Sequence, residues 1–259
     1  MDLPTIAITV AAGLAMGAIN NVAGGAGIFA LWAFQYGCDL PLAIANPTTR
    51  LGALGVGLFA WLGFRRAGWR PDARAWQLAS YAIPAAFAGN LLALRAPDLA
   101  FRIYLAVVLC ALLVQQLRAR PIASPLKGSR WLGPLGCALI GFHMGFAQIG
   151  TGFVATLVLV ATYDRDLLKV NVAKAVIVIT SSFASLVGFA LAPFALPDQQ
   201  AVIAWEPAIW LAVGTATGSF LASKWSIVQG AGAVRRVVVV IAALSLLEQL
   251  VQIVVLLRR

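Results

Sequence analysis

The stretch that decides the fold spans residues 17–27 and reads GAINNVAGGAG. It interrupts an apolar segment, Ile6 to Gly37, that is too long for one straight membrane crossing, and its glycines disfavour a continuous helix. A second apolar segment, Trp131 to Tyr163, is interrupted in the same way at residues 143–152, which read HMGFAQIGTG. The sequence therefore predicts two broken helical segments.

The two breaks belong to an internal repeat. Residues 125 positions apart match without a gap: Gly25 with Gly150, Gly27 with Gly152, Asp39 with Asp164, Leu42 with Leu167, Asn46 with Asn171, Gly63 with Gly188 and Phe64 with Phe189. Farther along the offset drifts, and Gly89 pairs with Gly218. We therefore expect a duplication, with repeat 1 over residues 1–120 and repeat 2 over residues 126–259.

The composition places the whole chain in a membrane. Of its 259 residues, 61% are hydrophobic and 11% charged, which is far from the composition of a soluble domain. Besides the broken segments, six apolar runs are long enough to cross a bilayer as helices. They are Leu42 to Gly63, Trp76 to Leu94, Ile103 to Leu117, Leu167 to Pro193, Trp205 to Ala222 and Val237 to Leu257. No polar stretch is long enough for a soluble domain, so residues 1–259 are expected to form one all-α transmembrane unit.

The distribution of Lys and Arg chooses between two topologies, because these residues collect in cytoplasmic loops. If each broken segment crosses the membrane once, the better orientation puts ten basic loop residues inside and seven outside. If each dips in and returns as a re-entrant hairpin, thirteen lie inside and four outside. The hairpin topology is favoured, and it gives each repeat three full crossings. The predicted fold is therefore two inverted repeats, each a broken re-entrant helical hairpin plus three transmembrane helices.

Several other classes of protein are disfavoured. The net charge of +10 comes from short loops rather than one basic surface, so nucleic acid is not an expected partner. Cys38, Cys110 and Cys137 are scattered and the chain has one histidine, so neither a metal site nor a cofactor is expected. The N-terminus has no Lys or Arg before its apolar run, so the first segment is expected to remain in the mature protein.

Paired discontinuous helices in inverted repeats are typical of secondary transporters, in which the breaks meet near the midplane and form the substrate site. Non-helical backbone at that depth must be covered by protein or line a wet cavity, and the N-termini of half-helices attract anions. A structural alternative stays open. The glycines can instead serve close helix packing, as in contacts between small residues four positions apart.

Three ionisable residues lie well inside the predicted spans: Arg50, Lys174 and Glu248. A cation in hydrocarbon costs at least about 2.5 kcal/mol, so each cation needs a partner or a wet cavity. Arg50 follows Asn46 by four residues and Lys174 follows Asn171 by three, so each shares a helix face with a repeated Asn. We expect the two cations to converge beside the breaks and hold an anion. Alternatively, either cation reaches a membrane interface or pairs with a helix C-terminus.

The candidate substrate-binding residues supply positive charge, neutral hydrogen bonds or exposed backbone. They are Asn20, Asn21, Gly24, Gly25, Gly27, Asn46, Thr49, Arg50, His143, Gln148, Gly150, Thr151, Gly152, Asn171 and Lys174. An Arg can bind an oxyanion through two parallel hydrogen bonds, whereas a Lys acts as a point charge. His143 can bind substrate, carry a proton or be a satisfied polar residue. Glu248 can couple transport to protons or bond a Gln across the bundle.

The motifs resemble a known family. The run at residues 17–27, followed by DLPLAIAN at residues 39–46, is similar to the N-terminal signature of the TauE/SafE family of sulfite and organosulfur-anion exporters. Residues 145–152 and 164–171 resemble its second copy, and the likeness covers essentially the full length. One departure is that Gln148-Ile149 stands where the first copy has Ala23-Gly24. The resemblance implies a permease for sulfite, a sulfonate such as sulfoacetate, or a related anion in the bacterial inner membrane.

Other functions compete with this interpretation. An intramembrane enzyme is disfavoured, because the sequence lacks HExxH, GxSxG and paired intramembrane Asp residues. An anion channel, a permease for another small carboxylate or oxyanion, and a non-transporting membrane scaffold remain open. A scaffold would need neither buried cations nor paired breaks. The exact anion, the direction of transport, the coupling ion and the oligomeric state also stay open.

Overall fold

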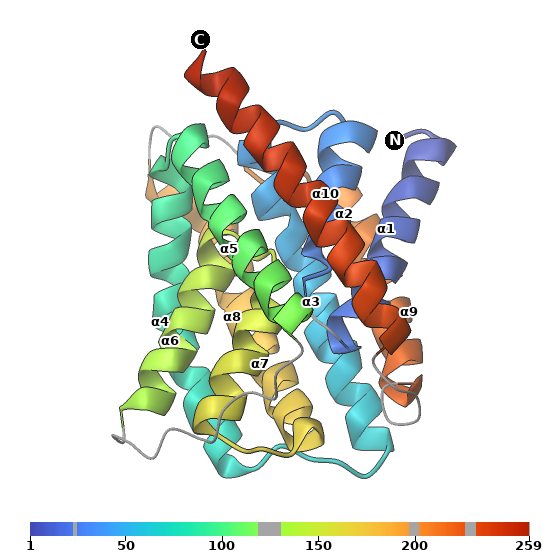
Figure 1. The fold of residues 1–259 in the computed structure, drawn as a ribbon, viewed down its shortest axis with the longest axis vertical. Helices are drawn as coiled ribbons and strands as arrows, with labels where there is room; N and C mark the ends of the chain where they lie inside the picture. The colour runs from blue at the N-terminus through green and yellow to red at the C-terminus, as the bar shows by residue number, and fades with distance from the viewer. Residues whose placement is uncertain (23–24, 119–130, 197–201, 226–231, 259) are drawn as a thin grey trace.

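The computed structural model describes residues 1–22, 25–118, 131–196, 202–225 and 232–258, and every regular element in these ranges is a helix. The helices are α1 (Leu3–Val22), α2 (Gly27–Trp32), α3 (Leu42–Arg66), α4 (Ala73–Arg95), α5 (Asp98–Arg118), α6 (Leu132–Phe146), α7 (Thr151–Thr162), α8 (Leu167–Ala195), α9 (Trp205–Trp225) and α10 (Gly232–Leu257). A π-helix, η1 (Ala33–Gly37), continues α2. Together they form an elongated bundle (Figure 1).

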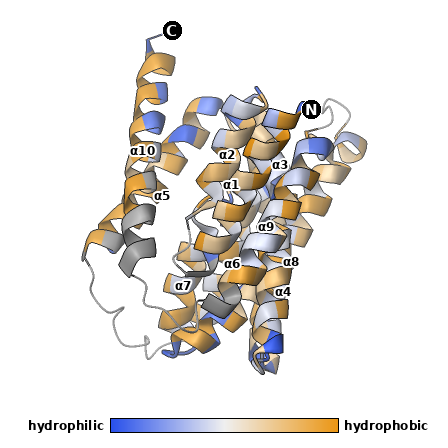
Figure 2. Ribbon diagram, turned by 90° about the vertical axis from the view of Figure 1, so that its right-hand side faces the viewer, coloured by the Kyte–Doolittle hydropathy of each residue, from blue (hydrophilic) through white to orange (hydrophobic). Residues whose placement is uncertain are grey.

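The surface of the bundle suits a bilayer. Four stretches in the described helices are long and apolar enough to cross a membrane: Leu3–Asn20, Ala73–Arg95, Asp98–Gln115 and Leu167–Ala195. Large apolar side chains such as Val107, Leu135 and Phe194 are exposed along the helices. Hydrophilic residues gather toward the two ends of the bundle (Figure 2). The protein is therefore a multi-pass membrane protein, and each of the six predicted apolar runs lies within one helix.

Both predicted breaks are present, and both are shorter than predicted. The first follows Val22, at the end of α1, and the second covers Ala147 to Gly150, between α6 and α7. Gly25 and Gly150, which the repeat pairs with each other, have φ of +87° and +84°, a conformation that favours glycine. Gly24, the side chain of Asn21 and the boundary between the proposed repeats at residues 120–126 lie outside the described residues.

Each broken segment returns to the end of the bundle from which it started. Near the start of α1, Thr9 Oγ1 lies 3.7 Å from the Sγ of Cys38, just beyond η1. Near the start of α6, a Cβ at Gly136 would collide with Val158, which lies in the last turns of α7. The two hairpins open toward opposite ends of the bundle, where α1 and η1 enter from one end and α6 and α7 from the other (Figure 1).

The helix contacts come in pairs that correspond when the two halves of the chain are exchanged. Helix α1 packs on α9 as α6 packs on α4, and α3 packs on α9 as α8 packs on α4, while α3 contacts α8 and α5 contacts α10. The closest approaches also match. A Cβ at Gly218 would overlap the carbonyl oxygen of Leu14 in α1, and a Cβ at Gly89 would overlap that of Phe142 in α6. These two glycines permit close helix packing, and they lie outside the breaks, whose glycines were the subject of the structural alternative.

The largest hydrophobic cluster surrounds the breaks. It contains Ala26 and Ile28 from the first break and its half-helix, Ala147 and Ile149 from the second, and Leu112 from α5. Apolar packing therefore covers one side of the non-helical backbone, as membrane depth requires. Polar groups are left to hold the other side.

Candidate functional site

The two breaks touch each other in the middle of the bundle. Gln148, in the second break, lies against Gly27, the first residue of α2, where a Cβ would come within 2.9 Å of the Gln148 Oε1. The Gln148 side chain is buried, and its Oε1 has no hydrogen-bond partner among the described residues. A buried, unpaired amide oxygen is costly unless another group binds it. The contact between the breaks thus contains an available hydrogen-bonding group.

His143 holds the second break in place. Its Nε2 lies 2.8 Å from the carbonyl oxygen of Ile149, which can only accept, so Nε2 carries the hydrogen in the neutral ring. The Nδ1 then accepts from the hydroxyl of Tyr104 in α5, 2.6 Å away. Both ring nitrogens are occupied. These contacts match the reading of His143 as a satisfied polar residue rather than a substrate ligand.

Arg50 is fully buried against the C-terminus of α6, where the last carbonyl groups lack partners within the helix. All five of its N–H groups have acceptors. These are Ser185 Oγ for Nε (3.0 Å), Asn46 O and Thr49 Oγ1 for NH1 (both 2.9 Å), and Asn46 Oδ1 and Gly145 O for NH2 (both 3.1 Å). An anion could bind Arg50 directly only by displacing one of these acceptors.

The neighbours of Arg50 complete a closed network, which we call the Arg50 cluster: Asn46, Thr49, Arg50, Asn90, Gly145, Phe146 and Ser185. Asn46 Nδ2 donates to Phe146 O at 2.9 Å, and Ser185 Oγ donates to Asn90 Oδ1 at 2.7 Å. The Phe189 ring lies 5.2 Å from the Arg50 guanidinium, and the C-terminal end of α6 carries partial negative charge. The contacts of Arg50 therefore match the alternative in which it pairs with a helix C-terminus.

Lys174 is buried with far fewer partners. Its side chain lies in α8 with 6% of the residue exposed. Within the described part of the chain, its Nζ makes one hydrogen bond, a long one of 3.4 Å to Thr156 Oγ1 in α7. An ammonium group has three donors, and no described carboxylate lies within ion-pairing distance. Lys174 therefore keeps unused donors and an uncompensated charge.

Lys174 lines a small cavity, which we call the Lys174 cavity. Asn20 from the last turn of α1, Asn171 from α8 and Gly57 from α3 line it with Lys174. Its volume of about 10 Å³ has room for roughly one water molecule. The structure thus brings together three of the predicted site residues, Asn20, Asn171 and Lys174, at one place between both halves of the chain.

The expected convergence of the two cations is wrong. Ser185, which binds Arg50, lies eleven residues beyond Lys174 in α8, which is roughly 16 Å along the axis at 1.5 Å per residue. Helices α3 and α8 begin at opposite ends of the bundle. Residues near their N-termini therefore lie at different depths. At the offset of 125 residues, Lys174 corresponds to Thr49, the neighbour of Arg50, but the two cations lie at different depths in the bundle.

The remaining candidates shape the backbone at the breaks. Gly150 precedes α7 in the left-handed conformation, and Thr151 Oγ1 donates to the Gln148 carbonyl oxygen at 2.6 Å. Gly152 O accepts from Thr156 Oγ1 at 2.8 Å, which links the start of α7 to the partner of Lys174. Gly25 faces the Leu112 side chain rather than a polar site.

Sequence reasoning missed several polar partners. Asn90 and Ser185 lie in apolar helices, Tyr104 is a half-buried residue of α5, and the Gly145 and Phe146 carbonyls are backbone groups with no sequence signal. Arg102, which directly precedes the predicted apolar run Ile103 to Leu117, is a buried residue of α5 that donates to Asp98 and to Gln249 of α10, both at 3.4 Å. Its spacing of four residues from Asp98 was a usable signal.

Glu248 connects α10 to the first broken segment. Its carboxylate accepts from Trp32 Nε1 and from the Tyr36 hydroxyl, at 2.5 and 2.6 Å. A hydrogen bond to a Gln, one of the two alternatives for Glu248, is not among these contacts. In the described ranges, no three His, Cys, Asp or Glu side chains are grouped as metal ligands.

Comparison with known proteins gives one match. The family model described as "Sulfite exporter TauE/SafE" matches residues 9–248 of the 259-residue chain. No curated protein and no solved structure gives a significant match. The matched region includes both breaks, the Arg50 cluster and the Lys174 cavity.

Proposed function

The chain belongs to the sulfite exporter TauE/SafE family, and on that premise we propose that this membrane transporter carries sulfite or an organosulfonate. The proposed anchor for the anion is the Lys174 ammonium, with Asn171 and Asn20 as neutral hydrogen-bond donors. The proposed location is the bacterial inner membrane. The proposal narrows the wider set of sequence candidates to the residues that retain unused donors.

We further propose that residues 1–120 and 126–259 are inverted repeats within one transport unit. Hairpins that open toward opposite ends and helix contacts that exchange the two halves support this arrangement. Breaks that meet at Gln148 and Gly27 support a substrate path near the middle of the membrane.

The observation that carries the proposal is the poorly paired Lys174. A buried cation without a counter-charge is costly, and a bound anion would remove that cost. The same argument does not apply to Arg50, because its donors are filled and its charge faces the C-terminus of α6. Binding of an anion would therefore lower the free energy more at Lys174 than at Arg50.

The size of the Lys174 cavity favours a carrier over an open channel. A space for about one water molecule cannot hold sulfite, so α1, α3 and α8 must separate locally before substrate enters. A pathway that must open for each substrate gives exchange across the membrane rather than continuous conduction. Counterflow of labelled anion against unlabelled anion tests this property.

The experiment compares wild type, Lys174→Met and Lys174→Arg in liposomes, with uptake of labelled sulfite and sulfoacetate. Met keeps much of the Lys volume but removes the charge, so we expect at least about a hundredfold loss of uptake, equal to about 2.7 kcal/mol of lost transition-state stabilisation. We expect Lys174→Arg to retain part of the uptake. Thermal unfolding in detergent checks that each variant is folded.

Two results would contradict the proposal. Wild-type uptake no faster than that of protein-free liposomes would remove the transport function for these anions. Wild-type rates in a folded Lys174→Met variant would remove Lys174 from the site while leaving transport intact.

A further inference from the structure

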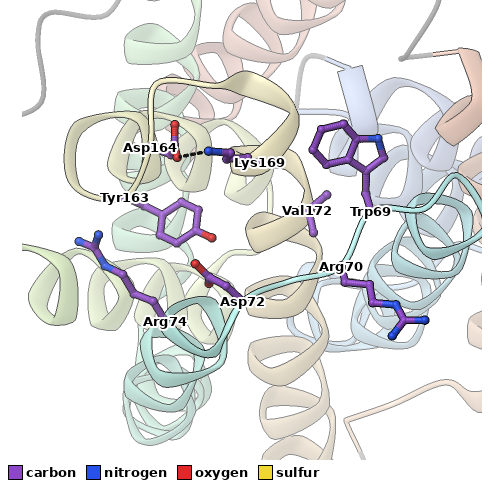
Figure 3. Close-up of a pocket in the computed structure, with 8 residues that line it drawn as sticks. All are labelled: Trp69, Arg70, Asp72, Arg74, Tyr163, Asp164, Lys169 and Val172. Atoms are coloured by element: carbon purple, nitrogen blue, oxygen red, sulfur yellow. Dashed lines mark hydrogen bonds and ion pairs between the residues drawn. The ribbon is translucent and has the colours of Figure 1, made fainter.

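A larger polar pocket lies at one end of the bundle, between the α3–α4 and α7–α8 connections (Figure 3). Its volume is about 260 Å³, enough for a small oxyanion with water. Trp69 and Arg70 lie on one side of the pocket, Tyr163 and Asp164 lie on the other, and Val172 lies between them (Figure 3). We call it the basic-end pocket.

The charges of the basic-end pocket favour anions. Three cations, Arg70, Arg74 and Lys169, line it together with two carboxylates, Asp72 and Asp164. Asp72 caps α4 by accepting from Ala75 N at 2.7 Å, and Asp164 accepts from Asp166 N and from Lys169 Nζ. The carboxylates are thus engaged locally. Arg70 makes no hydrogen bond or ion pair with the described residues, and Lys169 uses one of three donors.

Two titratable side chains of the pocket, Tyr163 and Asp164, have shifted pKa values. The hydrogen bond from Asp166 N and then Lys169 lower the pKa of Asp164, so its carboxylate stays ionised. Burial, followed by the hydrogen bond with Asp72, raises the pKa of Tyr163 to about 12, so its hydroxyl stays neutral. Asp164 therefore contributes a negative charge to the pocket at neutral pH, and the Tyr163 hydroxyl contributes none.

One layer of apolar side chains separates the basic-end pocket from the Lys174 cavity. A small hydrophobic cluster consists of Ala60, Phe64, Val172 and Ala175. Val172 lines the basic-end pocket, while Ala60 and Ala175 line the Lys174 cavity. An anion in the pocket is thus separated from Lys174 by the side chains of this single cluster.

The pocket at the other end of the bundle differs in charge. It has a volume of about 100 Å³ and reaches Asn46 and Pro47, and Asp98 is the one charged residue among its described lining residues. Pro47 and Val172 lie 125 positions apart, so the repeat places corresponding residues in the two pockets. Equivalent positions thus open onto a basic pocket at one end and a carboxylate-bearing pocket at the other.

From this difference we infer that the basic-end pocket is a capture site for a small oxyanion, from which substrate passes the Val172 layer to Lys174. This inference rests on the proposed function and adds a second binding site and a preferred loading side. Clustered cations raise the local concentration of an anion and therefore lower the KM on their own side. By the distribution of Lys and Arg, that side is the cytoplasm.

The test measures initial rates of labelled sulfite uptake in inverted membrane vesicles, in which the basic end faces the bath. We compare wild type, Arg70→Gln, Lys169→Gln and the double variant. Arg165→Gln is the matched control, because Arg165 is an exposed cation of the same α7–α8 connection that does not line the pocket. Lys174→Met is assayed in parallel to monitor the proposed substrate site.

We expect each single variant to raise the KM about threefold and the double variant roughly tenfold, with kcat unchanged, since removed charges weaken capture but not passage. The increase should shrink as salt is added. Arg165→Gln should leave the KM unchanged. Right-side-out vesicles should show a higher KM than inverted ones for wild type.

The outcomes separate the two proposals. An unchanged KM in the double variant, or an equal increase in Arg165→Gln, overturns the capture site while transport itself stands. Wild-type vesicles that take up no more sulfite than vesicles without the protein overturn the proposed function, and the capture site with it. A folded Lys174→Met variant with wild-type rates overturns the assignment of Lys174.

Discussion

The Arg50 cluster and the Lys174 cavity occupy related places in the two halves of the chain, yet their buried cations differ in how many hydrogen-bond acceptors surround them. Asn46 precedes Arg50 in α3, and Asn171 precedes Lys174 in α8. Each of these two helices follows a broken segment. Arg50 has an acceptor for every N–H group, whereas Lys174 has one long hydrogen bond to Thr156. The difference shows that two buried cations at related places in a sequence can have very different numbers of hydrogen-bond acceptors.

The largest effect is expected when Arg50 is removed from the Arg50 cluster. Arg50→Met removes every hydrogen bond of the guanidinium and leaves the Gly145 carbonyl oxygen without this partner. Each buried polar group left without a partner costs about 1–3 kcal/mol, so the variant should unfold at a lower temperature or fail to accumulate. Thermal unfolding in detergent measures this loss.

Lys174→Met is the matched control for that experiment. Because it removes a cation with a single described partner, its unfolding temperature should stay at or above that of wild type. Equal destabilisation of both variants would contradict the division of roles between the two cations.

A smaller effect comes from the repeated asparagines. Asn46→Leu removes the donor to Phe146 O and one acceptor of Arg50, and should cost about 2 kcal/mol of stability. Asn171→Leu should cost less than about 1 kcal/mol, because Asn171 is half-buried at a cavity. Its effect should instead be a raised KM for sulfite. Chemical unfolding and transport kinetics on the same two proteins would show whether the effects separate in this way.

The smallest effect concerns the single partner of Lys174. Thr156→Val removes the hydroxyl but keeps the shape of the side chain, so stability should fall by no more than about 1 kcal/mol. The ammonium then turns more freely, and we expect about a threefold change in the KM for sulfite. A hundredfold loss of uptake in a folded protein would show that Thr156 itself contacts the substrate.

Much of the fold could be predicted from the sequence. The length of an apolar run and the glycines that interrupt it are properties of residues that are close together in the chain. The six apolar runs and both breaks lie where the sequence placed them, and the family resemblance agrees with the family match. The π-helix η1 was not predicted, since no residue type marks it. His143 was placed inside the second break but lies in the last turn of α6.

The candidate site was harder to predict. Sequence spacing placed Arg50 and Lys174 on related helices but could not show how many acceptors surround each one. The deciding acceptors of Arg50 include the Gly145 carbonyl, a backbone group, and Ser185, which lies 135 residues away in the chain. The depth of each cation also depends on the opposite directions of α3 and α8, which a list of matched residues does not contain.

The most direct test of the central claim locates a bound anion. Selenite is a heavier analogue of sulfite, so anomalous diffraction from crystals soaked in selenite would mark its position. The account predicts a selenium peak about 4 Å from Lys174 Nζ, because a selenite oxygen rather than the selenium accepts the charge-assisted hydrogen bond, with the hydrogen bonds of Arg50 intact. A peak at the Arg50 guanidinium, or density confined to places remote from Lys174, would contradict it.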